Sequence, residues 1–424
     1  MKSIQIFIIP ILLQLLLNAC STAKYEKINL IHKDTLHFAG INDIHTNFYF
    51  YDKSSKKEYL FNYDGFNKKI MIFNFANAHK INEIPLKNGI NSFYVHNLDS
   101  IFLSNNDEFS EKNNTISLIN SKGEIKNIYD FSKVLISKML VVKEQNDSNI
   151  KNDTNISFKL NGNPYSFFNF YFKNNLFFLQ ITPVALERNE KYHYPSIAVV
   201  LLKNDSLSNL DLLGNYPDFY KSKDVYSADY TSFVVKNIEY PTKTDTIQAK
   251  FSIINSFILT DDVYCHRKTI YSTGFAADTI ATFNIPSNNK GSFLPITKHF
   301  QGDDVVFYGF KYSSIKYDNF RNLYYRTAIH TKQRQTINDE NGEQKEVSRQ
   351  NWSIICADKD FKIIDEIFIP DDANSNYAKD FFITKNGLAF IKLEDVFANN
   401  GITIVKKKLQ RFKVANPTSE NGKI

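Results

Sequence analysis

The stretch FFNFYFKNNLFFLQI, residues 167–181, has an aromatic-rich run on each side of two asparagines. Phenylalanine and tyrosine suit the pleated, half-buried surface of a β-strand. Asn174 and Asn175 both tolerate the positive φ that a two-residue type I′ turn requires. The stretch therefore predicts a β-hairpin, and the rest of the chain repeats its pattern.

Similar pairs of strand-like runs occupy most of the sequence. Each pair is predicted around a polar turn, at 48–63, 69–86, 91–106, 115–131, 197–213, 352–369 and 380–394. The last pair turns at Asn386-Gly387, the strongest short hairpin signal in the chain. The composition agrees, with 37 Phe and 24 Tyr against a single Trp. No amphipathic helical pattern stands out, so the sequence predicts an all-β fold.

The spacing of these pairs indicates the architecture. The larger units into which these pairs combine recur roughly every 45–70 residues, and four-stranded propeller blades repeat on a similar scale. Dividing the chain by such a unit predicts a β-propeller of six blades, with seven as the alternative count. Two β-sandwiches, or another large β fold, form the alternative architecture. The polar segments 141–164 and 330–351 interrupt the rhythm and are expected to be exposed loops, the second one a protruding hairpin.

The amino terminus carries an export signal. The apolar run IQIFIIPILLQLLL, residues 4–17, follows Lys2 and is shorter than the roughly 20 residues of a spanning helix. Residues 17–20, Leu-Asn-Ala-Cys, resemble the bacterial lipobox. That resemblance implies cleavage before Cys20 and lipidation of its thiol. A plain signal peptide with an incidental cysteine and an uncleaved anchor are the alternatives.

These observations predict the organisation of the chain. It comprises a lipoprotein signal peptide at 1–19, a lipidated tether at 20–30, a β-propeller domain at 31–413 and a C-terminal tail at 414–424. Stable anchoring needs more than one acyl chain, and the lipobox resemblance implies a diacylglycerol and an N-acyl group. Ser21 and Thr22 follow the cysteine, so the inner-membrane retention position holds no Asp. We therefore expect the outer membrane, with the periplasmic and cell-surface faces both open.

One further stretch supports a family resemblance. IKYDNFRNLYYRTAI, residues 315–329, places a Tyr-Asp turn before a strand that contains Leu323-Tyr324-Tyr325-Arg326. Together with the lipobox and the aromatic, Asn-rich strand pairs, it makes the chain resemble uncharacterised TolB-like six-bladed β-propeller lipoproteins of Gram-negative bacteria. The resemblance covers most of the chain and implies an extracytoplasmic propeller of unknown biochemical role. It transfers no catalytic residue.

The same stretch holds the candidate binding residues. On an extended strand, Tyr324, Arg326 and Ala328 share one face, and Tyr325 lies on the other. An arginine flanked by tyrosines can contact carboxylates, phosphates or sugar rings. We therefore predict Tyr324, Arg326, Tyr325 and Asp318 as candidate binding residues. The alternative is that Arg326 pairs with an acid such as Asp318 and braces a blade.

The two remaining cysteines leave a choice open. Cys265 and Cys356 form either a disulfide, which an oxidising compartment permits, or two buried free thiols. His266 follows Cys265, but adjacent residues on a strand point to opposite faces. We therefore expect a buried Cys265 and an exposed His266, and no joint site.

A short acceptor-like motif recurs. Asp followed by Ser or Thr and an aliphatic residue starts at Asp34, Asp99, Asp205, Asp245 and Asp278. It resembles the acceptor pattern for O-glycosylation of exported proteins in some Gram-negative bacteria. The alternative is a turn followed by the start of a strand.

The sequence contains no signature of a known chemistry. It lacks a Gly-rich phosphate loop, a Gly-x-Ser-x-Gly elbow and a His-Glu-x-x-His helix, and no cofactor or metal site is predicted. A formal charge of +6 over 424 residues is too dilute to favour nucleic acid. We expect a lipid-anchored envelope protein that acts as a non-catalytic binding or scaffold protein, with a protein, peptide or glycan partner. The alternative is an extracytoplasmic hydrolase or lyase with its site at the axial mouth of the propeller.

Overall fold

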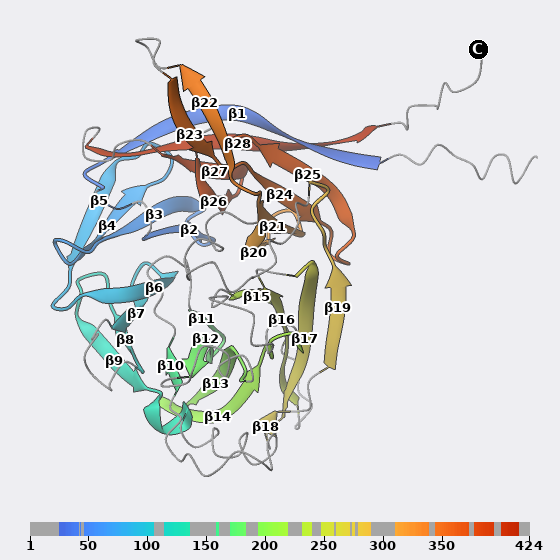
Figure 1. Ribbon diagram of the computed structural model, residues 1–424. Helices are drawn as coiled ribbons and strands as arrows, with labels where there is room; N and C mark the ends of the chain where they lie inside the picture. Colours follow the sequence, from blue (N-terminus) through green and yellow to red (C-terminus); the bar gives the residue numbers. More distant parts are fainter. Residues whose placement is uncertain are drawn as a thin grey trace, which may run out of the picture.

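The fold is a ring of antiparallel sheets around one axis (Figure 1). The computed structural model describes residues 25–41, 43, 46–105, 114–135, 158–160, 170–183, 194–218, 231–239, 247–257, 260–271, 274–275, 279–289, 310–338, 344–372, 377–393 and 400–414. Regular structure in these ranges is almost entirely β-strand, with one α-helical turn at 132–135. The prediction of an all-β propeller with six blades is confirmed.

Each blade is a sheet of four or five strands. Blade 1 consists of β2 (Asn47–Asp52), β3 (Lys57–Asp64), β4 (Lys69–Asn74) and β5 (Lys80–Pro85). Blade 2 consists of β6 (Ile90–Asn97), β7 (Ser100–Asn105), β8 (Thr115–Ile119) and β9 (Ile125–Asp130). Blade 3 consists of β10 (Phe158–Leu160), β11 (Phe170–Lys173), β12 (Leu176–Pro183), β13 (Ile197–Lys203) and β14 (Ser206–Leu213).

The second half of the ring follows the same order. Blade 4 consists of β15 (Thr231–Glu239), β16 (Ile247–Phe257), β17 (Asp262–Tyr271), β18 (Gly274–Phe275) and β19 (Thr279–Asn284). Blade 5 consists of β20 (Lys311–Asp318), β21 (Leu323–Ile329), β24 (Trp352–Ala357) and β25 (Ile363–Ile369). Blade 6 consists of β26 (Tyr377–Thr384), β27 (Gly387–Lys392), β28 (Gly401–Val414) and β1 (Tyr25–Ala39).

The predicted hairpins are present, and their turns follow local chemistry. Asn174 and Asn175 adopt φ of 55° and 60°, as a type I′ turn requires. One turn is shifted by a residue. Thr384 pairs directly with Gly387, so the central turn residues are Lys385 and Asn386, and the glycine is the first residue of β27. The glycine is needed in the strand because its backbone passes close to β28.

The N-terminal strand closes the ring. β1 pairs with β28 from Tyr25 opposite Val414 to Ala39 opposite Gly401, and the two strands run side by side in Figure 1. β1 is therefore the outer strand of a blade whose other three strands come from the C-terminal end. It starts six residues before the expected domain boundary at 31, so residues 25–30 belong to blade 6 and not to the tether. Their apolar members join the core between blades 5 and 6, since Ile28 is buried there.

The buried apolar side chains of the described residues form six clusters, and each cluster lies between two neighbouring blades. The cluster between blades 6 and 1 joins Phe38 of β1 and Ile404 of β28 to Phe73 of β4. Burying one large apolar side chain contributes about 1.5–3 kcal/mol. Because both faces of each blade are covered in this way, each blade needs its neighbours to bury its apolar side chains.

A hairpin arm projects from blade 5. β22 (Gln333–Asn338) and β23 (Gln344–Arg349) form a separate two-stranded sheet inserted between β21 and β24, and the arm stands away from the ring in Figure 1. The expectation of a protruding hairpin at 330–351 is thus confirmed. Most of the other polar segment, 141–164, lies outside the described residues.

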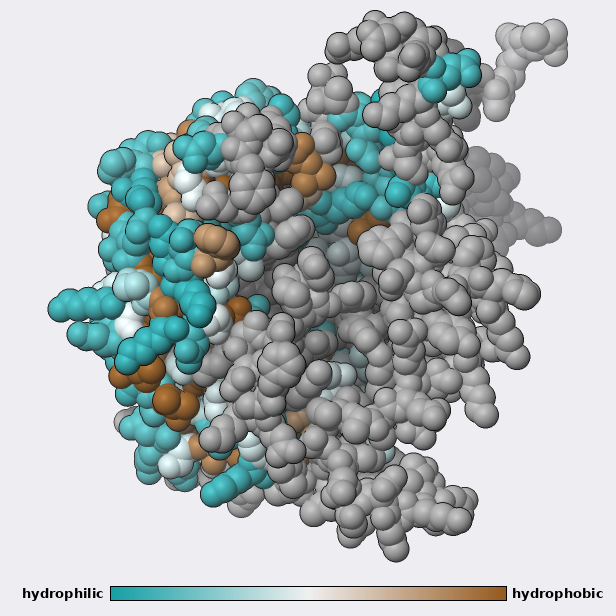
Figure 2. All heavy atoms as spheres, turned by 60° about the vertical axis from the view of Figure 1, so that its left-hand side comes forward, coloured by the Kyte–Doolittle hydropathy of each residue, from teal (hydrophilic) through white to brown (hydrophobic). Residues whose placement is uncertain are grey.

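The outer edges of the blades are mainly polar. Figure 2 shows hydrophilic side chains over most of the described surface on the side of blades 1 and 2, with separate hydrophobic spots. Ile81 of β5 and Ile125 and Ile128 of β9 are exposed apolar residues there. Scattered exposed apolar residues of this kind are normal for a soluble surface and need no partner.

Candidate functional site

Arg326 lies inside the interface between blades 4 and 5. Its side chain is 1% exposed, and its guanidinium carbon lies 3.6 Å from the centroid of the Tyr312 ring. It donates to Ser256 Oγ (3.0 Å) and to the carbonyl oxygens of Phe257 (3.2 Å), Thr260 (2.5 Å), Asp261 (2.7 Å) and Ile285 (2.9 Å). These bonds use all five N–H donors of the guanidinium. They support the alternative that Arg326 braces a blade, with carbonyl oxygens as its partners in place of an acid. A contact between Arg326 and a ligand stays a prediction.

Asp318 is fully buried and pairs with a different arginine. Its carboxylate accepts from Arg321 Nη1 at 2.6 Å and from the Tyr325 hydroxyl at 3.0 Å. Arg321 also donates to the carbonyl oxygens of Thr384 and Lys385 in blade 6. The structure therefore brings together two of the four predicted site residues, Asp318 and Tyr325, in the brace between blades 5 and 6.

Tyr324 lies on the opposite face of β21 and packs toward blade 4. Its ring stacks on Phe361 at 4.4 Å between centroids and an interplanar angle of 15°. Burial raises the pKa of Tyr324 above its ordinary value, with smaller contributions from Cys265 and Tyr317. The alternation of faces along this strand is therefore as predicted, but both faces are interior.

The cysteines are free thiols and the histidine beside one of them is buried. Cys265 and Cys356 are both buried and unlinked, so the disulfide alternative is wrong. The expectation of an exposed His266 is also wrong, since this residue is 3% exposed. The reason is that both faces of β17 are covered. On the face that His266 shares, Lys268 Nζ lies 2.5 Å from Asp211 Oδ2 of blade 3.

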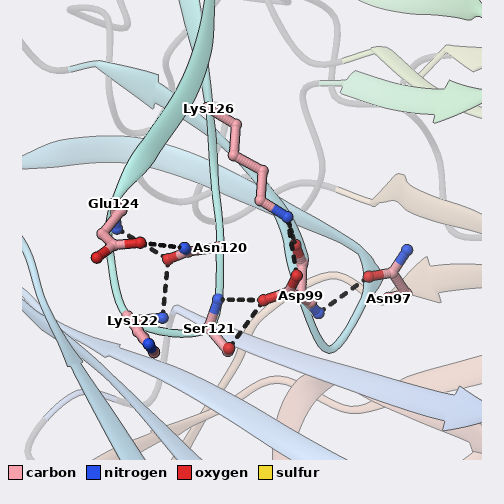
Figure 3. Close-up of polar contacts among 7 residues, drawn as sticks. All are labelled: Asn97, Asp99, Asn120, Ser121, Lys122, Glu124 and Lys126. Carbon is pink, nitrogen blue, oxygen red and sulfur yellow. Dashed lines mark hydrogen bonds and ion pairs between the residues drawn. The ribbon is translucent and has the colours of Figure 1, made fainter.

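Most of the Asp-Ser/Thr motifs stand at the start of a strand. The hydroxyl residue is the first residue of a strand at Ser100, Ser206 and Thr279. Figure 3 shows how Asp99 joins two turns of blade 2. Its carboxylate accepts from Ser121 Oγ at 2.8 Å and from Lys126 Nζ at 2.8 Å, and these bonds, that of Lys126 first, lower the pKa of Asp99. The turn alternative fits this site, Asp245 lies outside the described residues, and glycosylation stays a prediction.

Side chains from all six inner strands meet around the axis, and we call them the axial core. The members are Phe48 of β2, Tyr94 of β6, Tyr171 of β11, Phe233 of β15, Lys316 of β20 and Asp380 of β26. The ring centroids of Phe48 and Tyr94 are 5.7 Å apart, those of Tyr94 and Tyr171 are 6.0 Å apart, and those of Tyr171 and Phe233 are 5.3 Å apart. The axial core therefore links consecutive blades at the centre of the ring.

The polar groups of the axial core are engaged with one another. Lys316 Nζ lies 2.6 Å from Asp380 Oδ1 and donates to the Phe381 carbonyl at 2.5 Å. The Tyr171 hydroxyl donates to the Phe233 carbonyl at 3.1 Å. Burial raises the pKa of Tyr94 to about 12, and burial, then Tyr94 and Asp380, raise that of Tyr171. Both phenols stay neutral near pH 7, which suits a structural centre.

A second group of side chains gathers around the axis on one face of the ring. The inner strands of the blades run in the same direction, so the turns that follow them share a face, which we call the hairpin-turn face. Its described inner turns are 53–56, 98–99, 174–175, 319–322 and 385–386. These turns place charged and aromatic residues from different blades near one another.

We call this group the basic axial cluster. It consists of Tyr51 and Lys53 of blade 1, Lys173 of blade 3, Phe320 of blade 5 and Lys385 of blade 6. The rings of Tyr51 and Phe320 are 5.3 Å apart between centroids, and Lys385 Nζ lies 5.8 Å from the Tyr51 centroid. Burial lowers the pKa of Lys173, and Lys53 lowers it further. Blades 1 and 5 are not adjacent in the ring, so the contact of Tyr51 with Phe320 bypasses blade 6 near the axis.

Among the described residues, no carboxylate lies within ion-pair distance of Lys53, Lys173 or Lys385. Asp52 is next to Lys53, but its carboxylate accepts from Ser54 and Ser55 of its own turn. Those bonds lower the pKa of Asp52 to about 2. The cluster therefore presents three ammonium groups beside two aromatic rings.

A small cavity adjoins the β26–β27 turn. It has a volume of about 200 Å³, lies between blades 6 and 1, and is lined by Asp34, Glu58, Asn386 and Lys406 among others. Lys406 Nζ donates to the Phe75 carbonyl at 2.6 Å. Burial lowers the pKa of Lys406, and Glu58 and Asp34 oppose that shift. Because Asn386 follows Lys385, the cavity and the basic axial cluster meet at the β26–β27 turn.

The basic axial cluster could not be predicted from local patterns because its members are far apart in the chain. A usable signal is nevertheless present in the hairpins. Lys173 ends the first strand of its hairpin, and Lys53 and Lys385 each open the turn that follows such a strand. Superposing the predicted hairpins would have placed three lysines close to the same turn.

Comparison with known proteins finds similarity at the level of structure. The chain matches no family model and no curated protein sequence. A member of the DUF4221 family from Bacteroides vulgatus shares the fold at 19% identity and a TM-score of 0.56, covering 91% of this chain and 99% of that chain. At this identity the similarity shows the fold alone.

Two further solved structures are more distant. A Bacteroides fragilis protein described as exported is 11% identical with a TM-score of 0.43, covering 91% of this chain and 95% of that chain. The WD40 domain of SCAP from fission yeast is 11% identical with a TM-score of 0.32, covering 90% of this chain and 74% of that chain.

Two kinds of feature are absent from the part of the chain that the structure describes. It contains no helix with the length and hydrophobicity needed to cross a bilayer. It also contains no group of three or more His, Cys, Asp or Glu side chains placed to hold a metal ion.

Proposed function

We propose that this chain is a lipid-anchored protein of the cell envelope whose propeller is a non-catalytic binding platform. The observation that carries the proposal is the basic axial cluster, where Lys53, Lys173 and Lys385 stand beside two aromatic rings. Three charged side chains of the interior are committed to structural contacts. Arg326 is saturated by blade 4, and Lys316 and Asp380 neutralise each other. The hairpin-turn face is therefore the surface that we assign to ligand binding.

The anchoring part of the proposal rests on the sequence. Cys20 lies outside the described residues, and the lipobox-like residues 17–20 support its lipidation. β1 starts at Tyr25, and the intervening link spans at most about 17 Å at roughly 3.4 Å per residue. A lipid on Cys20 would therefore hold blade 6 close to the membrane. Membership of the TolB-like lipoproteins and location in the outer membrane belong to the same proposal.

Replacing the cysteine tests the anchor. Cys20→Ser in the full chain is expected to abolish incorporation of labelled palmitate and to leave the uncleaved precursor, because the thiol is the acylation site. Globomycin should cause the same accumulation in the wild type. Ser21→Ala is the matched control and should be processed normally. A Cys20→Ser protein that is still cleaved and lipid-labelled would contradict the anchor.

Binding without turnover tests the platform. The purified protein is applied to an array of glycans and peptides, and each retained ligand is recovered and weighed by mass spectrometry after prolonged incubation. We expect a retained ligand of unchanged mass. The alternative, a hydrolase or lyase at the axial mouth, predicts cleaved products, and their appearance would overturn the proposal.

A further inference from the structure

The two terminal strands of blade 6 continue beyond its inner strands as a ribbon. We define the terminal ribbon as residues 25–31 of β1 paired with residues 408–414 of β28. β27 pairs with β28 only as far as Lys408, so the two terminal strands run on past it side by side, as Figure 1 shows. Tyr25 and Val414 therefore lie together at the far end of the ribbon.

One face of the terminal ribbon is packed against blade 5. Ile28 lies in the core between blades 5 and 6, and Leu30 and Leu409 pack against the same core. The Ile28 N–H also donates to Asp365 Oδ2 of β25 at 2.7 Å. These contacts hold the ribbon on the outer strand of blade 5 and leave its second face toward solvent.

The second face of the terminal ribbon is made by three cross-strand pairs. Side chains alternate between the two faces of a strand, so the residues that alternate with Ile28 and Leu30 share this face with their partners on β28. We call the set the outer ribbon face, and its pairs are Lys27 with Phe412, Asn29 with Gln410 and Ile31 with Lys408. The four polar members are exposed, Ile31 is 46% exposed and Phe412 is half-buried.

The outer ribbon face combines basic and apolar side chains and contains no acidic one. Lys27 and Lys408 each stand opposite an apolar residue. Among the described residues, no carboxylate lies within ion-pair distance of Lys408. Lysines on outer strands commonly prevent unwanted strand pairing. That role accounts for the charge, but it does not account for the exposure of Ile31 and Phe412 beside it.

We propose that the outer ribbon face rests on an anionic bilayer, with Lys27 and Lys408 at the lipid phosphates and Ile31 and Phe412 among the headgroups. The inference rests on the proposed lipid anchor and deepens it, because it states which face of blade 6 contacts the membrane. Protein segments that lie on a bilayer surface combine the same two kinds of residue. Their lysines attract anionic headgroups, and their apolar side chains enter the boundary with the acyl chains.

The anchor brings this face to the membrane. A lipid on Cys20 leaves at most about 17 Å of chain before Tyr25, at roughly 3.4 Å per residue, and Lys27 follows directly on β1. Tethering raises the effective concentration of the second contact, so a weak attraction is sufficient. Each lysine near an anionic leaflet strengthens binding by about fivefold. The neighbouring Lys33 and Asp34 carry opposite charges and leave this balance unchanged.

Contact at the outer ribbon face fixes the orientation of the propeller. A lipid tether alone lets the ring turn above the bilayer, whereas the second contact holds blade 6 against it. Blade 3 stands opposite blade 6 in the ring (Figure 1), so its outer residues stay in solution.

A fluorescent label at the centre of the face tests the contact. The mature protein, as cells process it, carries Gln410→Cys with a nitrobenzoxadiazole label, and the native Cys265 and Cys356 are buried. The vesicles contain phosphatidylcholine alone, or phosphatidylcholine with an equal amount of phosphatidylglycerol. Flotation with the vesicles reports the anchor, and quenching of the label by neutral acrylamide reports whether the face is covered.

We expect the protein to float with both kinds of vesicle and the label to be shielded only on the anionic ones. The two lysines together contribute about thirtyfold to binding, so quenching there should fall by about threefold. Lys27→Gln/Lys408→Gln should restore the quenching seen on phosphatidylcholine. About 1 M NaCl should have the same effect without any change of lysine, because the Debye length is then roughly 3 Å.

Lys122→Gln/Lys203→Gln is the matched control, since both lysines are exposed and lie on blades 2 and 3. It should leave the shielding on anionic vesicles unchanged. A label at Lys203→Cys, on the blade opposite the ribbon, should be quenched equally on both kinds of vesicle.

Flotation and quenching together separate the inference from the proposed anchor. Flotation with both kinds of vesicle and equal quenching of the label at position 410 overturns the inference and leaves the anchor intact. Flotation with the anionic vesicles alone, with the label shielded, overturns the anchor and supports the face. Shielding that also appears on neutral vesicles and rises with protein density shows that a second copy covers the face, which overturns the inference. Flotation with neither kind, or with the anionic kind alone without shielding, overturns both.

Discussion

Arg326→Met is expected to lower the free energy of unfolding by about 3–5 kcal/mol, because it removes the donor of several buried hydrogen bonds and leaves their acceptors unsatisfied, at about 1–3 kcal/mol each. Methionine fills much of the same volume, so the effect does not come from a cavity. It comes from the acceptors that stay behind: the Ser256 hydroxyl and four carbonyl oxygens of blade 4 lose the bonds from Arg326 at once. Of the four carbonyl oxygens, that of Asp261 keeps a bond from the Ile285 N–H. Replacing a whole buried ion pair can be neutral, but here only the donor is removed.

Urea denaturation followed by fluorescence measures this loss. Trp352 is the single tryptophan and is 1% exposed in the core between blades 5 and 6, so its emission reports the opening of that interface. Arg267→Met is the matched control, since Arg267 is an exposed arginine on β17, and a change within about 0.5 kcal/mol is expected. If Arg326→Met unfolds at the wild-type urea concentration, the brace between blades 4 and 5 is wrong.

Gly387→Ala is expected to cost about 3 kcal/mol or more, which exceeds the usual penalty for overpacking a core. A β-carbon at this position would lie 2.0 Å from the Lys407 carbonyl oxygen and 3.0 Å from the Leu409 nitrogen. Both atoms belong to the backbone of β28 and cannot rotate away. β27 would have to leave the ladder that joins it to β28, so the closing blade would come apart.

The control for this prediction is Gly65→Ala. Gly65 has an ordinary φ, and an added β-carbon would meet only the Tyr63 ring, at 3.5 Å. We expect its thermal midpoint to stay within a few degrees of the wild type. The Gly387→Ala protein should be recovered in much lower soluble yield and should melt well below it. Equal midpoints for the two variants would show that β27 does not approach β28 as closely as described.

Local features of the sequence predicted the blades well. Turn residues such as Asn174-Asn175 act over a few positions, and the strands on both sides need only alternate or continue an apolar pattern. The number of blades followed from the chain length and the size of a blade. The first inference depends on short-range chemistry and the second on chain length, and a single sequence records both.

The contacts between blades could not be predicted in the same way. Arg326 donates to carbonyl oxygens of residues between 257 and 285. Every residue has a carbonyl oxygen, so residue types cannot identify these partners. His266 was expected to be exposed because its strand was considered alone, whereas a propeller blade is covered on both faces. The basic axial cluster depends on closure of the whole ring, so its members meet only after every blade is in place.

The first strand, β1, was also not predicted, because its partner strand lies at the other end of the chain. Residues 25–30 fall within the predicted tether at 20–30, although Lys27 and Asn29 alternate with apolar residues as in a strand. Their pairing with β28 joins positions that are nearly 400 residues apart. That pairing is the condition for everything assigned to the axis, because an open ring would not hold blade 1 opposite blades 3 and 5.

A cross-link between the two ends of the chain tests closure directly. Asn29 and Gln410 are exposed and stand opposite each other in the register of β1 and β28, within the range that a disulfide can join. In Asn29→Cys/Gln410→Cys protein, mild oxidation should give a linked β1–β28 peptide by mass spectrometry. Lys27→Cys/Gln410→Cys, which is out of register by two residues, should give little. Equal linkage in the two variants, or none in the first, would contradict the closed ring.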